Sequence, residues 1–271
     1  MKKLLNNLTI IISIFFVIPI MYTLFNSFMD SVQLNHEGLQ FIPNQFNLHQ
    51  YYLIITDKAS YFRYFFNSAK ITIGVISGQV LISLFGAYGL YKMPKRLGNV
   101  ILSLYVFALL LPFQVTLIPN YIVFETIERL FEFEIIDTHM ALILPGIFSS
   151  LGIFLLRQFM QDIPSAYLEA AEIDGATNIQ ILFKVILPLL RPAIISLVVL
   201  VFIDNWNLIE QSLVFIKDPV KEPLSVFLEK IYNGDLKVFY AGSVLYMVPT
   251  LMIFYKGEKY IKEGIMTGGI K

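Results

Sequence analysis

The sequence contains no cysteine, and this absence removes three kinds of chemistry at once. Without thiols the chain can form no disulfide framework, no thiolate metal site and no cysteine nucleophile. The absence by itself does not name the compartment in which the protein works.

An excess of either charge is also missing, because 20 Lys and Arg residues balance 20 Asp and Glu residues and no long basic run occurs. A nucleic-acid partner is therefore not expected. The chain also lacks the G-x-x-x-x-G-K-[ST] loop that cradles nucleotide phosphates. His36, His49 and His139 are far apart without ligand spacing, so no metal site is expected. We expect a protein that is not an enzyme and holds no cofactor of its own.

What the sequence has in abundance is apolar residues. Of 271 residues, 56% are hydrophobic and only 15% are charged, and the mean hydropathy is +0.68. This apolar content is too large for one soluble core with its solvated surface. The composition predicts an integral membrane protein.

Long apolar runs in such a chain are expected to be helices, because each backbone amide in lipid must be paired within its own segment. The first run has about 21 residues, enough to cross a hydrocarbon core of roughly 30 Å, which favours a retained helix over a cleaved signal peptide. We therefore predict an all-α, polytopic membrane protein whose residues 1–271 form a single domain. The six predicted spans are 8–28, 66–90, 99–124, 139–157, 189–214 and 239–256.

The positive charges of the connecting segments indicate an orientation, since Lys and Arg accumulate in short cytoplasmic loops. With the N-terminus inside, the cytoplasmic positions are Lys2, Lys3, Lys92, Lys95, Arg96, Arg157, Lys184, Arg191, Lys256, Lys259, Lys262 and Lys271. The outer positions are Lys58, Arg63, Arg129, Lys217, Lys221, Lys230 and Lys237. This moderate bias predicts that both termini are cytoplasmic.

Two glycines in the second predicted span, Gly74 and Gly78, form a G-x-x-x-G pattern that permits close approach of another helix. The pattern is common by chance, so ordinary helix packing is favoured over a dedicated interface.

The segment 158–188, between the fourth and fifth spans, has signals for two short helices. Pro164 suits a helix start, and Gly175 suits the left-handed residue that closes one. Thr177 and Gln180 then match the capping-box spacing of a second helix. These signals predict a sharp turn between two helices.

Ala166, Ala170 and Ile173 are spaced to share one face of the first short helix, where another backbone could approach closely. The alternative is a structured loop that only joins two spans, and periodicity does not separate the two interpretations.

The order of residues in this segment resembles a known signature. Glu169-Ala170-Ala171 is followed after three residues by Gly175 and after nine more by Val185-Ile186-Leu187-Pro188. The pattern is similar to the Glu-Ala-Ala motif of permease subunits of ATP-binding cassette (ABC) importers, with Val185 replacing Ile. The whole chain resembles the carbohydrate branch related to the maltose transporter's smaller permease. Further matching positions are Asn67-Ser68, Pro112-Phe113-Gln114, Glu172-Ile173-Asp174, Asn205-Trp206-Asn207 and the tail Gly264–Lys271.

The resemblance implies a type I ABC importer permease fold in the bacterial plasma membrane, with the helix from Glu169 to Gly175 as a coupling helix. It implies that a cytosolic ATPase dimer, which binds ATP and Mg, contacts this helix. The other implied partners are a second related permease and an extracellular sugar-binding protein, and the implied mechanism is alternating access. The residues expected at the ATPase contact are Glu169, Ala170, Ala171, Asp174 and Gly175.

Polar residues in the fifth span are the candidate cargo path. An Asp at the centre of a span costs roughly 2.5–3.5 kcal/mol on insertion scales, so such residues need a reason to be there. Asp204, Asn207 and Gln211 have helical spacing, and Trp206 and Glu210, four apart, form an adjacent stripe. Asn205 is a further candidate in the same span. Carboxylate, amide and indole groups can bind sugar hydroxyls and ring faces. Gln114 in the third span is a weaker candidate.

Other interpretations stay open. The polar groups of the fifth span could reach the outer interface or pair with a neighbouring subunit. An importer for an amino acid or peptide, a secondary transporter and a membrane scaffold are the alternative functions, although no inverted repeat is evident. An acidic outer segment is predicted to be a solvated face or docking surface; it contains Glu125, Glu128, Glu132, Glu134 and Asp137.

Overall fold

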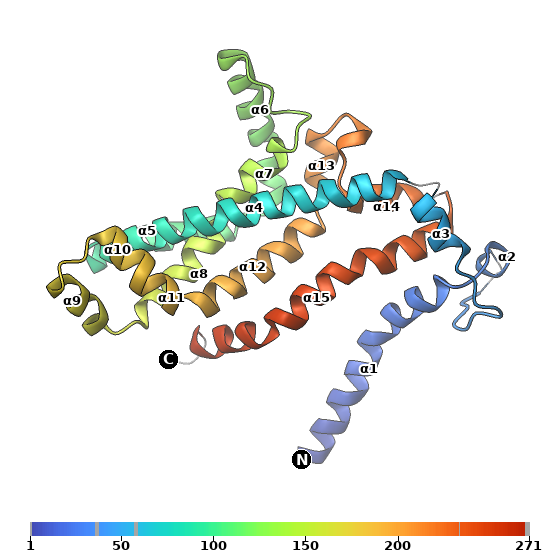
Figure 1. Ribbon diagram of the computed structural model, residues 1–271, viewed down its shortest axis with the longest axis horizontal. Helices are drawn as coiled ribbons and strands as arrows, with labels where there is room; N and C mark the ends of the chain where they lie inside the picture. Colours follow the sequence, from blue (N-terminus) through green and yellow to red (C-terminus); the bar gives the residue numbers. More distant parts are fainter. Residues whose placement is uncertain (1, 36–37, 57–58, 233, 269–271) are drawn as a thin grey trace. The chain divides into compact units, whose positions relative to one another are not determined.

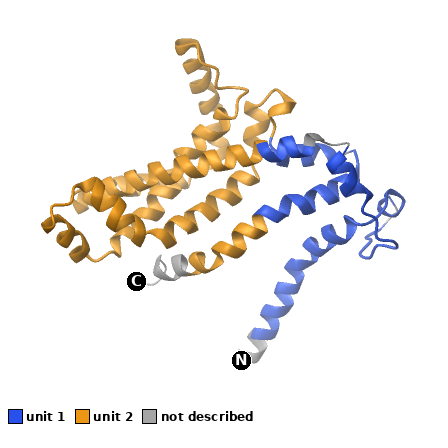
Figure 2. Ribbon diagram, viewed as in Figure 1, with its two compact units in different colours: residues 1–66, 223–249 blue, residues 67–222, 250–271 orange. Residues whose placement is uncertain are grey.

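The computed structural model describes residues 2–35, 38–56, 59–232 and 234–268, and this part of the chain is helical with no strand. The helices pack as two compact units, one of residues 1–66 and 223–249 and the other of residues 67–222 and 250–271 (Figure 2). The prediction of an all-α fold is confirmed. The prediction of a single domain stays a prediction.

The helices follow one another along the chain as Figure 1 shows. The first half has α1 Lys2–Asn26, α2 Ser31–Leu34, α3 His49–Thr56, α4 Ala59–Lys92, α5 Lys95–Leu109, α6 Phe113–Phe131, α7 Met140–Ile147 and α8 Ser150–Gln161. The second half has α9 Ser165–Ile173, α10 Asn178–Ile181, a π-helical turn Leu182–Ile186, α11 Leu187–Leu189, α12 Arg191–Trp206, α13 Glu210–Phe215, a 3₁₀ turn Pro219–Lys221, α14 Leu224–Tyr232 and α15 Leu236–Gly268.

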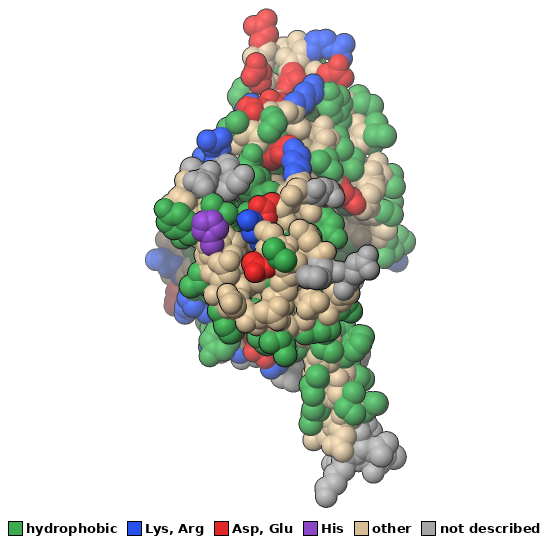
Figure 3. Space-filling view, turned by 90° about the vertical axis from the view of Figure 1, so that its right-hand side faces the viewer, with side chains coloured by type: hydrophobic (Ala, Val, Ile, Leu, Met, Phe, Trp, Pro, Cys, Tyr) green, Lys and Arg blue, Asp and Glu red, His purple; other side chains and the backbone are tan. Residues whose placement is uncertain are grey.

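Four helical segments are long and apolar enough to cross a membrane: Asn6–Asn26, Tyr61–Lys92, Met140–Gln161 and Leu236–Lys262. Two bent pairs of helices bring the number to as many as six. The apolar window of α1 has no buried residue, and Figure 3 shows hydrophobic side chains around this rod at the bottom of the view. A fully exposed apolar helix is what lipid, rather than water, would surround.

The third predicted span, 99–124, is not one helix. The helices α5 and α6 meet at an angle of 99° around Leu110–Pro112. Pro112 has no amide hydrogen to donate, and its ring disfavours the helical conformation for Leu111. These two effects end α5 and start α6.

The fifth predicted span, 189–214, is also interrupted. It turns by 75° where α11 meets α12, and α12 then ends at Trp206. The side-chain amides of Asn205 and Asn207 donate to the carbonyl oxygens of Val201 and Ile203 at 2.9 and 2.7 Å. Such side-chain bonds compete with the backbone ladder, and α13 resumes at Glu210. The spacing of Asp204 and Gln211 had predicted that they share one continuous helical stripe. The break between α12 and α13 lies between them, so they do not.

Glycines allow α4 to lie very close to α7 and α8 in the larger unit. A Cβ atom built on Gly78 would lie 2.5 Å from Ile147 Cγ1, and one on Gly74 would lie 2.9 Å from Ile143 Cδ1. In the other direction, Gly146 of α7 receives the side chain of Val75 from α4. The G-x-x-x-G pattern is therefore a packing device within the chain, as predicted.

Candidate functional site

The segment after α8 forms the two short helices that the sequence predicts. Pro164 directly precedes α9, and Gly175 has the left-handed φ of +76° that ends it. The Thr177 side chain accepts from the Gln180 amide while the Gln180 side chain accepts from the Thr177 amide, which completes a capping box at the start of α10. The prediction of a sharp turn between two helices is confirmed.

The first of these helices, α9, has one buried side chain, Leu168. Among the residues predicted to contact an ATPase, Ala171 is half-buried against the core of the larger unit. The others, Glu169, Ala170, Asp174 and Gly175, are exposed. Ile173 is 86% exposed, which leaves a large apolar side chain in the open on the same helix. This surface is therefore available to another protein.

The sequence reasoning missed an ion pair that fastens this helix. Lys92 Nζ, at the end of α4, lies 2.6 Å from Glu172 Oε1 of α9. No local spacing could reveal it because the two residues are 80 positions apart.

The polar candidates of the third and fifth spans come together at the break between α12 and α13. Gln114 Nε2, in the first turn of α6, donates to Glu210 Oε2, in the first turn of α13, at 2.9 Å. Both side chains are exposed, as are Asp204 and Asn207, whereas Asn205 is half-buried beside Gly146. Two residues singled out separately thus share one polar site.

Trp206 differs from this exposed group. Its side chain is only 2% exposed, and its indole stacks on Phe202 with ring centres 5.2 Å apart and planes at 16°. A buried indole offers no face to a sugar in this conformation. The geometry therefore makes Trp206 a packing residue at the end of α12.

Two members of the acidic segment after α6 hold loops in place rather than face solvent. Glu128 Oε1 accepts from the backbone amide of Ile135 at 2.6 Å and also from that of Ile136. Asp137 Oδ1 accepts from the amides of Lys217 and Asp218 at 2.7 and 2.8 Å. Glu125, Glu132 and Glu134 are exposed, and charged side chains gather at the top of Figure 3.

The charge of Asp137 is stabilised by these donors. Partial burial raises the pKa of the Asp137 carboxyl, but the amides of Asp218 and Lys217 and the ammonium of Lys221 outweigh it, so the pKa lies below its ordinary value. Lys221 Nζ lies 3.1 Å from Asp137 Oδ2. His139 Nε2 and Asn67 Nδ2 add hydrogen bonds to backbone oxygens of the same loop, Lys221–Glu222.

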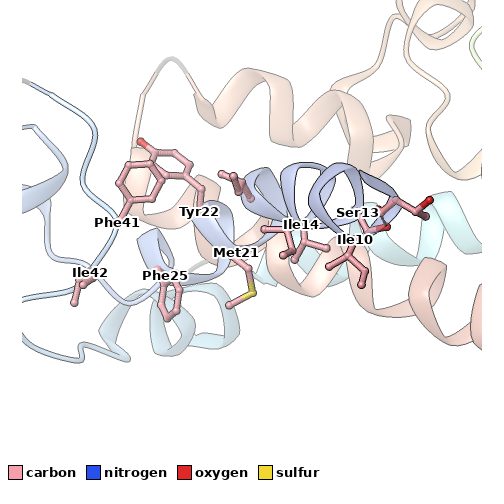
Figure 4. Close-up of a pocket in the computed structure, with 11 residues that line it drawn as sticks. Ile10, Ser13, Ile14, Met21, Tyr22, Phe25, Phe41 and Ile42 are labelled. Carbon is pink, nitrogen blue, oxygen red and sulfur yellow. Dashed lines mark hydrogen bonds between the residues drawn. The ribbon is translucent and has the colours of Figure 1, made fainter. Parts of the chain in front are cut away.

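A groove of about 610 Å³ runs along α1, but its chemistry does not suit a polar cargo (Figure 4). Its walls are the side chains of Ile10, Ile14, Met21, Phe25 and Phe41, together with Ile42 and a few neighbours. Such a wall has few hydrogen-bond partners for hydroxyl groups. Among the described residues no group of three or more His, Asp or Glu side chains could hold a metal ion.

With this architecture established, comparison with known proteins identifies its class. Residues 70–255 match the family of binding-protein-dependent transport system inner membrane components, so the chain belongs to this family of integral membrane permeases. The family resemblance predicted from the Glu169–Pro188 segment is thereby confirmed. A permease of this family is not itself a catalytic subunit.

Several relatives cover nearly the whole chain. The arabinooligosaccharides transport system permease AraQ of Halalkalibacterium halodurans is 27% identical over 94% of this chain and 91% of its own length. The polygalacturonan/rhamnogalacturonan transport system permease YtcP of Bacillus subtilis is also 27% identical, over 94% of this chain and 92% of its own length. The osmoprotective compounds uptake permease GgtD of Synechocystis sp. is 31% identical over 76% of this chain and 70% of its own length.

Among solved structures, a chain of a bacterial ABC transporter that imports alginate, an acidic polysaccharide, has the same fold. It superposes with a TM-score of 0.83 at 22% identity, covering 96% of both chains. A chain of the alginate transporter in complex with a pentasaccharide-bound periplasmic protein gives a TM-score of 0.67 at 12% identity, covering 95% of this chain and 94% of the other.

Proposed function

We propose that the chain is a permease subunit of an ABC importer that moves a carbohydrate across the plasma membrane. The observation that carries the proposal is the set of relatives that align over 94% of the chain and are named for arabinooligosaccharide and polygalacturonan transport. The exposed amide and carboxylate groups at the α12–α13 break are consistent with a cargo rich in hydroxyl groups.

The proposed complex contains a second related permease, two copies of a cytosolic ATPase and an extracellular sugar-binding protein. Both termini and α9 face the cytoplasm, as the distribution of Lys and Arg favours. ATP and Mg bind in the ATPase, and this chain contributes no cofactor site. The exposed residues Glu169, Ala170, Asp174 and Gly175, with half-buried Ala171, form the ATPase contact.

In the proposed mechanism, ATP binding closes the ATPase dimer and displaces α9. A short helix held at both ends transmits such a displacement as rigid-body motion, which a flexible loop would absorb. The permease cavity turns outward to receive cargo past Gln114, Asp204, Asn207 and Glu210, and hydrolysis returns it to the inward state. Asn205 and Trp206 support this path by packing.

Reconstitution into proteoliposomes tests the proposal. The chain would be combined with its partner permease, ATPase and binding protein, and uptake would be measured for labelled neutral and acidic oligosaccharides, amino acids, peptides and small osmoprotective solutes. ATP-dependent uptake of an oligosaccharide is expected. Uptake of only a non-carbohydrate solute would contradict the proposed cargo, and uptake without nucleotide would contradict the ABC mechanism.

A second cargo class has one specific observation in its favour. The relative GgtD, which is named for osmoprotective compounds, has 31% identity to this chain. A small osmoprotective solute is therefore the alternative cargo, and the same uptake panel separates it from an oligosaccharide.

A further inference from the structure

Three residues in the last two turns of α4 each contact a different part of the segment that contains α8, α9 and α10. Tyr88, Tyr91 and Lys92 are spaced at i, i+3 and i+4, so they lie on one face of the helix. Tyr88 Oη donates to Asn178 Oδ1 of α10 at 3.3 Å, and Lys92 forms its ion pair with Glu172 of α9. Tyr91 lies beneath the guanidinium of Arg157 of α8, 5.7 Å from ring centre to Cζ.

Below these polar contacts lies a buried apolar cluster of the larger unit. From α4 it includes Leu84, Ala87 and Tyr88, and from α9 it includes Leu168. Leu168 and Glu172 are four residues apart on α9, so the apolar anchor and the ion pair lie on the same face of that helix. The residues predicted to contact the ATPase lie mostly outside this face and remain exposed. The helix α9 is thus attached to α4 on one side and open on the other.

Arg157, near the end of α8, forms the third contact with this face of α4. Its side chain is 4% exposed and makes no ion pair among the described residues. With the Gln161 amide oriented so that its oxygen faces the guanidinium, Arg157 Nη1 donates to it at 2.6 Å. In this buried position the guanidinium is held by the ring face of Tyr91 on α4 and by the Gln161 amide of its own helix. The base of α8 is therefore held against α4 independently of α9.

We infer that Tyr88, Tyr91 and Lys92 are positioning residues that make the cytoplasmic end of α4 move together with the segment from α8 to α10, and that Lys92 does so for α9 itself. The inference rests on the proposed function, because it assigns to α4 the displacement that the ATPase imposes on α9. The covalent connections of α9 to α8 and α10 hold its two ends but would alone leave it free to rotate about its own axis. The Lys92–Glu172 pair and the Leu168 anchor remove that freedom.

The exposure of the ion pair makes the inference testable without unfolding the protein. The Lys92 and Glu172 side chains are 36% and 52% exposed, and exposed pairs of this kind contribute little to stability. Lys92→Ala and Glu172→Ala are therefore expected to insert and assemble as the wild type does. Lys95→Ala is the matched control, since Lys95 is exposed at the same end and forms no ion pair among the described residues.

The first measurement is the number of ATP molecules hydrolysed for each cargo molecule taken up by proteoliposomes. This ratio is expected to rise several-fold in Lys92→Ala and in Glu172→Ala. It should return toward the wild-type value in the exchanged pair, Lys92→Glu with Glu172→Lys. It should stay unchanged in the control Lys95→Ala. A wild-type ratio in both single variants would overturn the inference. So would an exchanged pair that performs no better than the single variants.

The second measurement does not depend on the cargo. Because the chain has no cysteine, spin labels can be attached at Gly89→Cys and Tyr167→Cys alone, two exposed positions on α4 and α9 outside the contact. The distance between the labels is expected to be the same with ADP and with trapped ATP, and to change with nucleotide once Lys92→Ala is added. A nucleotide-dependent distance in the otherwise wild-type chain would overturn the inference. Absence of saccharide uptake with a constant distance would instead contradict only the proposed function.

Discussion

Gln114 donates a 2.9 Å hydrogen bond to Glu210, although 96 residues separate them along the chain. Each residue lies in the first turn of the helix that follows an interruption, α6 after Pro112 and α13 after Asn207. The two breaks in the helical spans are therefore joined by side chains that can also bind a solute.

Removing this hydrogen bond is expected to impair transport more than folding. Glu210→Gln and Gln114→Ala should each lower the rate of carbohydrate uptake several-fold, because each removes a polar group offered to the cargo. Stability should change little, because the contact is exposed. Initial uptake rates at equal membrane expression measure the effect. Glu125→Gln, an exposed carboxylate on the same helix as Gln114, is the control and should transport normally. Unchanged uptake in both variants would exclude these residues from the cargo path.

Trp206 should matter for packing rather than for cargo binding. Trp206→Ala would leave a cavity beside Phe202 and lower the melting temperature of the detergent-solubilised protein. The expected loss is smaller than the roughly 3–5 kcal/mol measured for such changes in water-soluble cores, because lipid is as apolar as a protein core and the transfer contribution disappears. Trp206→Phe, which preserves the stacking, should retain most of the stability and normal uptake. Loss of uptake in a fully stable Trp206→Phe variant would show that the indole contacts the cargo.

The contacts of the Asp137 carboxylate with the Lys217 and Asp218 amides and with Lys221, called here the Asp137 clamp, should make stability depend on pH in the acidic range. Because the pKa of Asp137 is lower in the folded protein than in the unfolded chain, its charge contributes stability at pH values above its ordinary pKa of about 3.9. That contribution is lost as the pH falls through the folded-state pKa. The difference in melting temperature between the wild type and Asp137→Asn is therefore expected to be largest near neutral pH and to shrink below about pH 4. A difference independent of pH would show that the carboxylate charge is not what holds the Lys217–Asp218 loop.

Gly175 should be essential for the turn between α9 and α10. Its φ of +76° is a left-handed conformation that costs a residue with a Cβ roughly 1–2 kcal/mol. Gly175→Leu is expected to leave membrane insertion intact and to weaken co-purification of the ATPase, because α9 would end in a different direction. Gly89→Ala is the control, since Gly89 is an exposed helical glycine with open space around it. Normal co-purification and uptake in Gly175→Leu would contradict the coupling role.

The sequence predicted the coupling segment well because its signals act locally. Pro164, Gly175 and the Thr177–Gln180 box each determine the backbone within a few residues, and the structure has all three as expected. The six apolar runs were equally visible, although the third was predicted as one continuous span and the structure bends it by 99°.

Contacts between distant residues had no such signal. The Lys92–Glu172 pair joins residues 80 positions apart, and the Asp137 clamp spans a similar distance. Helical spacing also placed Trp206 on an accessible stripe, whereas packing against Phe202 buries it. The tail that contributed to the family resemblance ends in residues 269–271, which lie outside the described part of the chain.

The glycine contacts between α4 and α7 limit how this half of the molecule can deform. Ile143 and Ile147 occupy notches at Gly74 and Gly78, and Val75 occupies the notch at Gly146. The side chains of the two helices therefore interdigitate. Sliding one helix by a single residue would drive branched side chains into backbone, which a close-packed interior opposes. A rotation within this unit during a transport cycle would then fall at joints that lack this meshing, such as the bends at Leu110–Pro112 and Leu190.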